Sequence, residues 1–337
     1  MKVFDIFSGC GGASLGFQKA GFTIVGGIDI DADACNTFKK NLSVEPIVGD
    51  VTKINWKKIL SNLGLERGEL DVIIGCPPCQ GFTRLRCSVP NDPRNELVFY
   101  YSKIVKYFLP KFVVFENVPG ILNSKHRKYF NSFLKKIENL GYKYIYGTLN
   151  AADFGVPQIR KRVIVIATRL RNIRLSLPRP TVKKYKTVRE AFEGLPPVRA
   201  GEVCKWIPNH AAPKHTDRIM KIIKMIPKDG GSIRNLPKKY WLKCHLNHKG
   251  HRDVYGRLWW DRPAPTVTSG CLSASKGRYI HPSQDRTITA REAARLQGFS
   301  DNFVFYGTLT SVARQIGNSL PPPLAEAVAN HIFTLIS

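Results

Sequence analysis

The chain has 337 residues, of which 52 are Lys or Arg and 25 are Asp or Glu, so its formal net charge is +27. Hydrophobic residues make up 43%, enough for a sizeable core, which excludes a disordered, collagen-like or disulfide-stapled chain. No apolar run reaches the about 18 residues of a membrane-spanning helix, and Asp5 interrupts the apolar start, so we expect neither a membrane span nor a signal peptide.

Short β-rich runs alternate with amphipathic stretches over residues 1–168. The predicted strands are Lys2–Ile6, Thr23–Ile28, Asp71–Gly75, Phe112–Phe115, Lys143–Leu149 and Arg162–Ala167. The predicted helices between them include Ala32–Asn41, Leu97–Phe108 and Arg127–Leu140. This alternation favours an α/β fold with a mostly parallel sheet wrapped by helices.

The first predicted strand leads into the glycine-rich turn Phe7-Ser8-Gly9-Cys10-Gly11-Gly12. Glycines let a backbone turn tightly and approach a ligand closely at the edge of a sheet. Asp29, at the end of the second strand, is placed to accept hydrogen bonds from ribose hydroxyls, and Asp50 to meet an adenine amino group. The pattern predicts a nucleoside-cofactor pocket but does not separate a dinucleotide from S-adenosylmethionine. A tight turn without a ligand is the alternative.

Cys76-Pro77-Pro78-Cys79 follows an apolar strand. Two prolines make the loop rigid at the carboxyl end of the strand, where enzymes of this fold class place their sites. Cys79 can act there as a nucleophile if its pKa is lowered. Half of a zinc site and a redox pair are the alternatives, and the lack of a second Cys-x-x-Cys weighs against zinc.

Charged residues border two later apolar strands. Glu116 ends one of them, where a carboxylate is unfavourable unless it is paired or functional. In one cleft with Cys79, it could share a proton with a ring nitrogen. Arg160 and Arg162 precede the other strand and offer guanidinium donors to an anion or a carbonyl. A helix-capping Glu and a solvated basic turn are the alternatives.

The alternation of strand and helix patterns stops after Thr168, where prolines break the periodicity and predict a domain boundary near 169–175. From Arg169 to Arg262, 23 Lys and Arg stand against 7 Asp and Glu, a net of +16. Aromatic residues are interleaved with this charge: Trp206, Tyr240, Trp241, Tyr255, Trp259 and Trp260. The combination is typical of a nucleic-acid surface. A regular pattern then returns, with helices predicted over Ala290–Gln297 and Leu324–Leu335.

Taken in order, these motifs resemble those of the cytosine-C5 methyltransferase family over residues 1 to about 335. The matching motifs are Phe7–Gly11, Asp29, Asp50, Pro77-Pro78-Cys79-Gln80, Glu116-Asn117-Val118, Gln158-x-Arg160-x-Arg162, Arg262-Pro-Ala-Pro-Thr266, Arg291–Phe299 and Gln315–Ser319. The resemblance implies a Rossmann-like catalytic domain over 1–168 and a smaller, irregular target-recognition domain over 169–262. It also implies a return to the catalytic domain over 263–337.

For activity, the resemblance implies a DNA (cytosine-5-)-methyltransferase. Its predicted catalytic residues are Cys79, Glu116, Arg160 and Arg162. Cys79 would attack C6 of a cytosine in duplex DNA, Glu116 would contact N3 and the exocyclic amine, and Arg162 would hold the O2 side. Because C6 is not reachable inside a stacked duplex, the base must be flipped into the pocket.

The cofactor that the resemblance implies is S-adenosylmethionine. Its predicted pocket residues are Phe7, Gly9, Gly11, Asp29, Ile30, Asp50, Val51, Pro77, Asn318 and Ser319. Ile30 stands where many members have an aromatic side chain that stacks on adenine, so aliphatic packing is expected there. No metal is expected, because Cys244-His245-x-x-His248-x-x-His251 is irregularly spaced for zinc.

The implied partner is double-stranded DNA, bound by a monomer in a prokaryotic cytoplasm, at the nucleoid, with a cognate restriction endonuclease as a further candidate partner. One branch of the family methylates tRNA, and Phe82-Thr83-Arg84 resembles that branch. The Cys-Phe-Thr signature of that branch is absent. Here Cys204 is followed by Lys205, Cys244 by His245 and Cys271 by Leu272. A tRNA cytosine-C5 methyltransferase is therefore the alternative. A catalytically silent relative would lack the nucleophile or the cofactor loop, and both are present.

Overall fold

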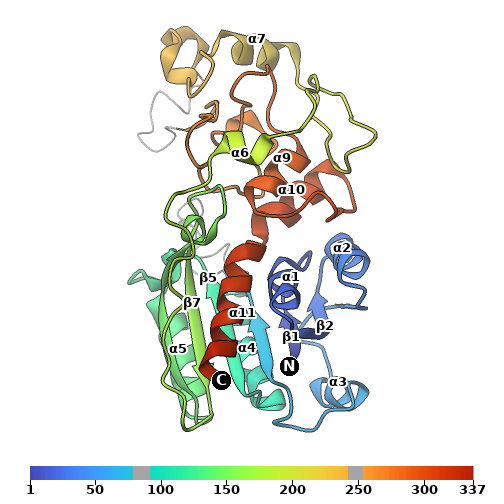
Figure 1. Ribbon diagram of the computed structural model, residues 1–337, viewed down its shortest axis with the longest axis vertical. Helices are drawn as coiled ribbons and strands as arrows, with labels where there is room; N and C mark the ends of the chain where they lie inside the picture. The colour runs from blue at the N-terminus through green and yellow to red at the C-terminus, as the bar shows by residue number, and fades with distance from the viewer. Residues whose placement is uncertain (79–91, 242–252, 337) are drawn as a thin grey trace. The chain divides into compact units, whose positions relative to one another are not determined.

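The computed structural model describes residues 1–78, 92–241 and 253–336. Its strands are β1 (Lys2–Ile6), β2 (Thr23–Asp29), β3 (Ile47–Val48), β4 (Val72–Gly75), β5 (Phe112–Asn117), β6 (Lys143–Asn150) and β7 (Lys161–Thr168) (Figure 1). Its α-helices are α1 (Gly12–Lys19), α2 (Ala32–Leu42), α3 (Trp56–Asn62), α4 (Leu97–Phe108), α5 (Arg127–Glu138), α6 (Val188–Phe192), α7 (Asp217–Met225), α9 (Ala290–Leu296), α10 (Leu309–Asn318) and α11 (Pro322–Ile336). Each predicted strand and helix is confirmed, with ends that differ by at most one or two residues.

The seven strands form one sheet in the order β3-β2-β1-β4-β5-β7-β6. The pairs among β1 to β5 are parallel, whereas β7 runs antiparallel to both β5 and β6. The predicted α/β fold with a mostly parallel sheet is therefore confirmed. Because β7 is reversed, its first residues reach the edge of the sheet at which β1, β4 and β5 end.

Each face of the sheet packs against its own helices. Phe4, Ile73 and Phe115 belong to a core shared with α3, α4 and α5. The side chains that alternate with these along each strand lie on the other face of the sheet, which packs against α1. The Ser14 hydroxyl of α1 donates a 2.6 Å hydrogen bond to the Asp5 carboxylate there. α1 in turn packs along α11. The carboxyl edge of the sheet is thus held by helices on both faces.

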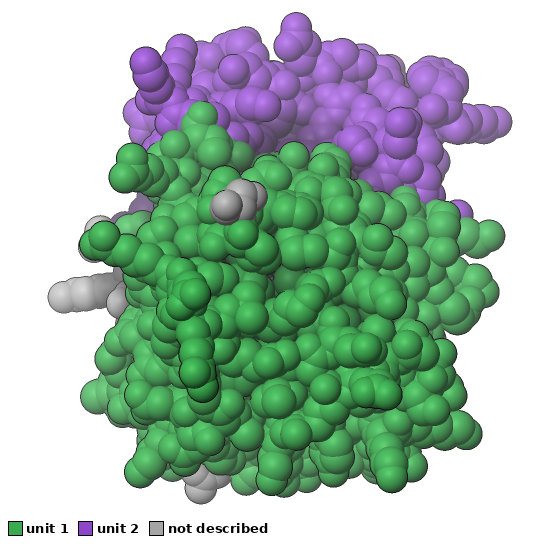
Figure 2. All heavy atoms as spheres, turned by 60° about the horizontal axis from the view of Figure 1, so that its bottom comes forward, with its two compact units in different colours: residues 1–154, 161–181, 320–337 green, residues 155–160, 182–319 purple. Residues whose placement is uncertain are grey.

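The chain divides into two compact units (Figure 2). The first comprises residues 1–154, 161–181 and 320–337, and the second comprises 155–160 and 182–319. These boundaries differ from the predicted segments, since residues 263–319 cluster with the second unit and only α11 returns to the first. That residues 169–262 recognise the target stays a prediction.

The second unit has little regular secondary structure, and buried arginines bind many of its backbone carbonyls. The largest fully buried side chains of the described residues include four arginines, all in this unit: Arg160, Arg257, Arg286 and Arg291. Arg257 donates to the carbonyls of Ile223, Ile226, His281 and Gln284. Irregular backbone leaves carbonyls without ladder partners, and the five donors of a guanidinium satisfy several of them at once.

The surface predicted from composition is smaller than the count of charges suggests. Arg257 is fully buried and cannot meet a polyanion, and the Tyr255 side chain is buried as well. Trp259 is covered by the guanidinium of Arg278, 3.9 Å from the ring centroid. Only Trp206 among the interleaved aromatics is largely exposed, at 77%. Among the described residues, no helix is both long and apolar enough to cross a membrane.

Candidate active site and cofactor pocket

Polar side chains gather on one face of the first unit's sheet, at the edge where the parallel strands end. Register pairs Asp5 with Ile74, Ile74 with Val114, and Glu116 with Ile164. Side chains along a strand alternate between faces, so residues two apart share a face. The four polar residues that this places together are Asp5 of β1, Cys76 just after β4, Glu116 of β5 and Arg162 of β7.

Glu116 and Arg162 form an ion pair at this edge. Arg162 Nε lies 2.8 Å from Glu116 Oε1, and each side chain is about one-tenth exposed. A further guanidinium nitrogen, Nη1, donates to the carbonyl of Lys161. The carboxylate near the end of this apolar strand is therefore paired with a cation. Two predicted catalytic residues are thus brought together.

The loop that leads to Cys79 is fixed at its start. The Cys76 N–H donates to the Ile6 carbonyl, and the Asn117 side-chain amide donates to the Pro77 carbonyl at 3.1 Å. Burial, with Glu116 nearby, raises the pKa of the Cys76 thiol well above its usual range. Cys76 is therefore held as a neutral thiol. Cys79, the predicted nucleophile, lies outside the described residues, as do Phe82-Thr83-Arg84.

The glycine-rich turn after β1 has a backbone that few residues adopt. Phe7, Gly9 and Gly11 have φ values of 62°, 52° and 90°, all left-handed. A Cβ on Gly11 would lie 2.7 Å from Leu42 Cδ1 and 2.9 Å from a ring carbon of Phe38. Gly11 is thus required by conformation and by space. A left-handed Phe is unfavourable, and such strain persists chiefly at functional sites.

Asp29 ties this turn to the second strand. Its carboxylate accepts hydrogen bonds from the Gly9 N–H at 2.8 Å and the Asp31 N–H at 2.9 Å. Burial raises the pKa of Asp29 from its usual value. A carboxylate has about four acceptor positions, so two bonds leave room for ribose hydroxyls. The sequence pointed to the ribose contact and missed the bond to the turn.

Apolar side chains are exposed just after β2 and at the end of β3. Ile30 is 73% exposed and Val48 is 57% exposed, and Val48 is paired in register with Asp29. Asp50 accepts from the N–H and hydroxyl of Thr52, bonds that lower its pKa. Val51 is buried beside it. The exposed apolar surface formed by Ile30 and Val48, next to the carboxylates of Asp29 and Asp50, suits a nucleoside, with its flat base and polar sugar.

Arg160, Asn318 and Ser319 belong to the second unit. Arg160 is 1% exposed and donates to the carbonyls of Val267, Gly317 and Ser319, each at 2.8–2.9 Å. The buried Gln158 amide likewise binds the Val267 N–H and the Leu296 carbonyl. Within this unit, the structure therefore connects the predicted motifs through backbone groups.

Asp5 is a residue that sequence reasoning missed. It is fully buried, and among the described residues its Oδ1 has no hydrogen-bond partner. Burial raises its pKa to about 7. The available signal was an Asp in the middle of the apolar strand Val3-Phe4-Asp5-Ile6. A buried carboxyl on the face of the site marks a place of functional interest.

No cluster of His, Cys, Asp and Glu that could hold a metal ion occurs in the described ranges, and the segment Cys244–His251 lies outside them. Cys10, Cys35 and Cys271 are buried cysteines. The geometry above consists of an ion pair, a strained glycine turn and two carboxylates.

Comparison with known proteins agrees with this geometry. A family model described as C-5 cytosine-specific DNA methylase matches residues 1–334. The type II methyltransferase M1.HphI of Haemophilus parahaemolyticus is 34% identical over 99% of this chain and 87% of that protein. The type II methylase M.HgiDII of Herpetosiphon aurantiacus is 31% identical over 98% of this chain and 94% of that protein.

Solved structures show the same likeness. A crystal structure from Escherichia coli, of a protein assigned as a prophage-encoded DNA modification methyltransferase, superposes with a TM-score of 0.81 at 27% identity. It covers all of this chain, which spans 99% of that one. The Entamoeba histolytica methyltransferase EhMeth shares the fold, with a TM-score of 0.69 at 18% identity and 100% and 99% of the two chains covered.

Proposed function

The chain belongs to the C-5 cytosine-specific DNA methylase family and is a DNA (cytosine-5-)-methyltransferase, and we propose that it acts through a covalent bond between Cys79 and C6 of a flipped cytosine. The observation that carries this proposal is the Glu116–Arg162 ion pair. It lies on the sheet edge at which β4 ends, and Cys79 follows β4 in the chain after Cys76-Pro77-Pro78.

Cytosine C5 is not nucleophilic enough by itself, and the proposed roles follow from that. The Cys79 thiolate adds to C6 and makes C5 electron-rich, as a soft nucleophile adding to the ring does. Glu116 contacts N3 and the exocyclic amine and stabilises the ring while electron density builds. Arg162 orients Glu116 and donates to the O2 side. Methylation, loss of the C5 proton and departure of the Cys79 sulfur restore the ring.

The proposed methyl donor is S-adenosylmethionine, and the residues present suit it. Asp29 keeps free acceptor positions for the ribose hydroxyls. Asp50 can accept a hydrogen bond from the adenine amino group, and exposed Ile30 provides aliphatic packing for the adenine ring. Phe7, Gly9, Gly11, Val51 and Pro77 are the other residues of the first unit that we propose to bind the cofactor. Bound S-adenosylmethionine supplies an electrophilic methyl group on a sulfonium sulfur.

We propose Asn318 and Ser319 as further cofactor-binding residues, on the ground of the family motif Gln315–Ser319 to which they belong. Arg160 binds the carbonyls of Gly317 and Ser319, which flank Asn318 in the chain. Its part in the proposal is therefore positioning: it holds the backbone at the end of α10, and it does not touch the reacting base.

The acceptor is DNA, and the finer assignments are part of the proposal. Residues 169–262 recognise the target sequence, a monomer acts on one duplex, and the enzyme works in a prokaryotic cytoplasm, at the nucleoid. Two of its relatives are named as type II enzymes, and on that ground we place this one in a restriction-modification system with a cognate endonuclease. tRNA is the competing acceptor and an arm of the test.

The test uses tritiated methyl from S-adenosylmethionine, with duplex DNA and bulk tRNA as parallel acceptors. We expect label in DNA, recovered as 5-methylcytosine and lost in Cys79→Ala. Cys204→Ala, which changes a buried thiol of the second unit, is the matched control and should keep activity. Label in tRNA alone would show that the enzyme belongs to the branch of the family that methylates tRNA.

A second acceptor tests the covalent step. In DNA that carries fluorine at C5 of the target cytosine, the final loss of a proton from C5 is blocked. The wild-type enzyme should then remain attached to the DNA after denaturation, whereas Cys79→Ala should not. Active enzyme that forms no such adduct would contradict the proposed nucleophile.

A further inference from the structure

A thiol stands between two carboxyl groups on the face of the sheet that packs against α1. β4 lies between β1 and β5 in the sheet. Gly75 of β4 is paired with Phe115 of β5, so Cys76, the next residue, comes level with Glu116. Asp5 of β1 lies on the other side of β4. Because neighbouring strands are about 4.8 Å apart, the Cys76 side chain has Asp5 on one side and Glu116 on the other.

Asp5 is the buried end of this row of three side chains. It is fully buried, and its Oδ2 accepts the 2.6 Å hydrogen bond from the Ser14 hydroxyl. Its Oδ1 has no hydrogen-bond partner among the described residues. A carboxylate so placed would leave a buried charge uncompensated, so the protonated form is favoured. Burial raises the pKa of Asp5 to about 7, and the charge of Asp29 acts in the same direction.

The Cys76 thiol senses both carboxyl groups. Burial contributes most to its raised pKa. The charges of Glu116 and Asp5 and a hydrogen bond to Glu116 add to that, whereas the charge of Arg162 opposes them. A thiol is both a weak donor and a weak acceptor. Cys76 can therefore take a proton from one neighbour while it gives its own to the other.

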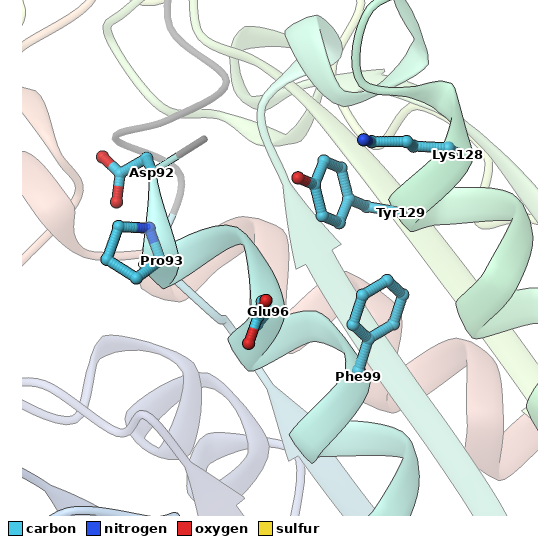
Figure 3. Close-up of a pocket in the computed structure, with 6 residues that line it drawn as sticks. All are labelled: Asp92, Pro93, Glu96, Phe99, Lys128 and Tyr129. Carbon is cyan, nitrogen blue, oxygen red and sulfur yellow. The ribbon is translucent and has the colours of Figure 1, made fainter. Parts of the chain in front are cut away.

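Other titratable groups near these strands lie on the opposite face of the sheet. The Tyr101 hydroxyl donates to two backbone carbonyls there, and burial raises its pKa well above its usual range, so it keeps its proton. Figure 3 shows Asp92 and Glu96 at a hollow that Phe99 and Tyr129 also line. These two rings pack in the core of that opposite face. The sheet therefore separates the carboxyl groups of the hollow from Cys76.

We propose that Asp5 and Cys76 are positioning residues for a proton: Asp5 holds it in the free enzyme, and Cys76 passes it to Glu116 when the base binds. This inference rests on the proposed function and deepens it, because Glu116 needs a proton to give to N3 of the ring. Glu116 is only 7% exposed, and a base beside it would exclude water further. An internal donor supplies the proton at that moment.

The proposed transfer conserves atoms and charge. The Asp5 O–H proton moves to the Cys76 sulfur while the Cys76 S–H proton moves to the Glu116 carboxylate, so the thiol is neutral before and after. Glu116 gives its proton to N3 as the Cys79 thiolate adds to C6, and the negative charge of the thiolate is thereby transferred to Asp5. After methylation, the C5 proton passes to solvent. When the Cys79 sulfur leaves as a thiolate, the N3 proton returns along the same row.

The test compares the pH dependence of single-turnover methylation, with saturating DNA and cofactor, from about pH 5.5 to about pH 8.5. Asp5→Asn cannot hold the proton, and Cys76→Ala interrupts the row. Cys76→Ser keeps a hydroxyl that donates and accepts. Cys204→Ala, which changes a buried cysteine of the second unit, is the control. Binding of S-adenosylmethionine and the free energy of unfolding are measured alongside, and the Cys76 variants test the row even where Asp5→Asn is unstable.

We expect Asp5→Asn and Cys76→Ala to be slower than the wild type by about tenfold or more near pH 6, as part of the contribution of a positioned acid. The difference should vanish above about pH 8, where Asp5 of the wild type has itself lost the proton. Cys76→Ser and the control should follow the wild-type profile. The double variant should be no slower than either single variant, because both changes interrupt one path.

A merely structural role gives a different pattern. If Cys76→Ala lost the same factor at every pH and Cys76→Ser did not recover it, or if the Asp5→Asn profile ran parallel to that of the wild type, the inference would be overturned. The wild-type enzyme would then still form its covalent adduct with DNA fluorinated at C5. Wild-type enzyme that forms no adduct would overturn the proposed function, and the inference with it.

Discussion

Arg162 Nε approaches Glu116 Oε1 to 2.8 Å across two neighbouring antiparallel strands. Each residue supports the other, because a nearly buried carboxylate or guanidinium without its partner is strongly destabilising. The pair also fixes where a carboxylate and a positive charge lie at the edge of the sheet. A site of this kind offers a ring both a carboxyl group and a guanidinium in one orientation.

Glu116→Gln should therefore lower the rate of methyl transfer by about 10²–10⁴, the usual contribution of a positioned acid–base group. Gln keeps an oxygen for Arg162 but carries neither the charge nor the exchangeable proton. The measurement is single-turnover methylation with saturating DNA and cofactor. Glu138→Gln, at the exposed end of α5, is the control and should be fully active. A loss below about threefold in Glu116→Gln would remove Glu116 from the chemistry.

Asp5 provides a pH-dependent prediction. Its pKa rises from 3.8 to about 7 on folding because the carboxyl group is buried. Between these values the native state holds a proton that the unfolded chain has lost, so its stability falls as pH rises and levels off above about 7. The difference is on the order of 4 kcal/mol, at about 1.4 kcal/mol for each pKa unit.

Asp5→Asn should remove that dependence. Urea unfolding of the wild type and the variant, measured from pH 4 to pH 8, gives the free energy of unfolding of each. We expect the wild type to lose stability relative to Asp5→Asn across this window, whatever constant cost the amide adds. Parallel curves for the two proteins would show that Asp5 ionises in the folded state as it does in the unfolded chain.

The sequence predicted the strands well because each is a short apolar run bounded by a turn, a signal carried by neighbouring residues. It predicted Glu116 for a related reason, since a carboxylate at the end of an apolar strand is unfavourable without a partner. The same rule applied to Asp5, but its significance depends on which face of β1 meets α1. That packing is a contact between segments that periodicity does not specify.

Other features depended on contacts that are distant in the sequence. Arg160 looked like an anion-binding residue, and its bonds to Val267 and Gly317 span more than a hundred residues. Arg257 counted toward the basic region, yet it is buried among carbonyls. Composition counts charged residues but does not tell which of them are buried. The unit boundaries differ for the same reason, because regular segments after residue 262 pack with the irregular region.

Gly11 and Gly21 form a matched pair for the cofactor turn. Both have φ near 90°, but a Cβ on Gly21 meets nothing within 4 Å, whereas on Gly11 it meets Leu42 and Phe38. Gly21→Ala should cost about 1 kcal/mol of stability through backbone strain alone. Gly11→Ala should cost about 3 kcal/mol, because overpacking adds to the strain. Chemical unfolding measures both.

The two variants should also differ in cofactor binding. Gly11→Ala displaces the turn that Asp29 holds, so S-adenosylmethionine should bind at least tenfold more weakly by calorimetric titration. Gly21→Ala lies at the far end of α1 and should bind it normally. Equal affinities would mean that the turn adapts to the added methyl group and does not form the pocket wall.

Arg160 and Arg162 stand two residues apart, and lysine substitutions should separate their roles. Lysine cannot replace a guanidinium that binds several carbonyls at once. Arg160→Lys should loosen the backbone around Gly317 and Ser319, which flank the proposed cofactor residue Asn318. We expect the KM for S-adenosylmethionine to rise about tenfold, with kcat largely kept. Arg162→Lys should instead lower kcat, because it disturbs Glu116, and leave that KM unchanged. If Arg160→Lys lowered kcat without changing KM, Arg160 would be a catalytic residue after all, and its carbonyl bonds would describe a resting arrangement that changes when substrate binds.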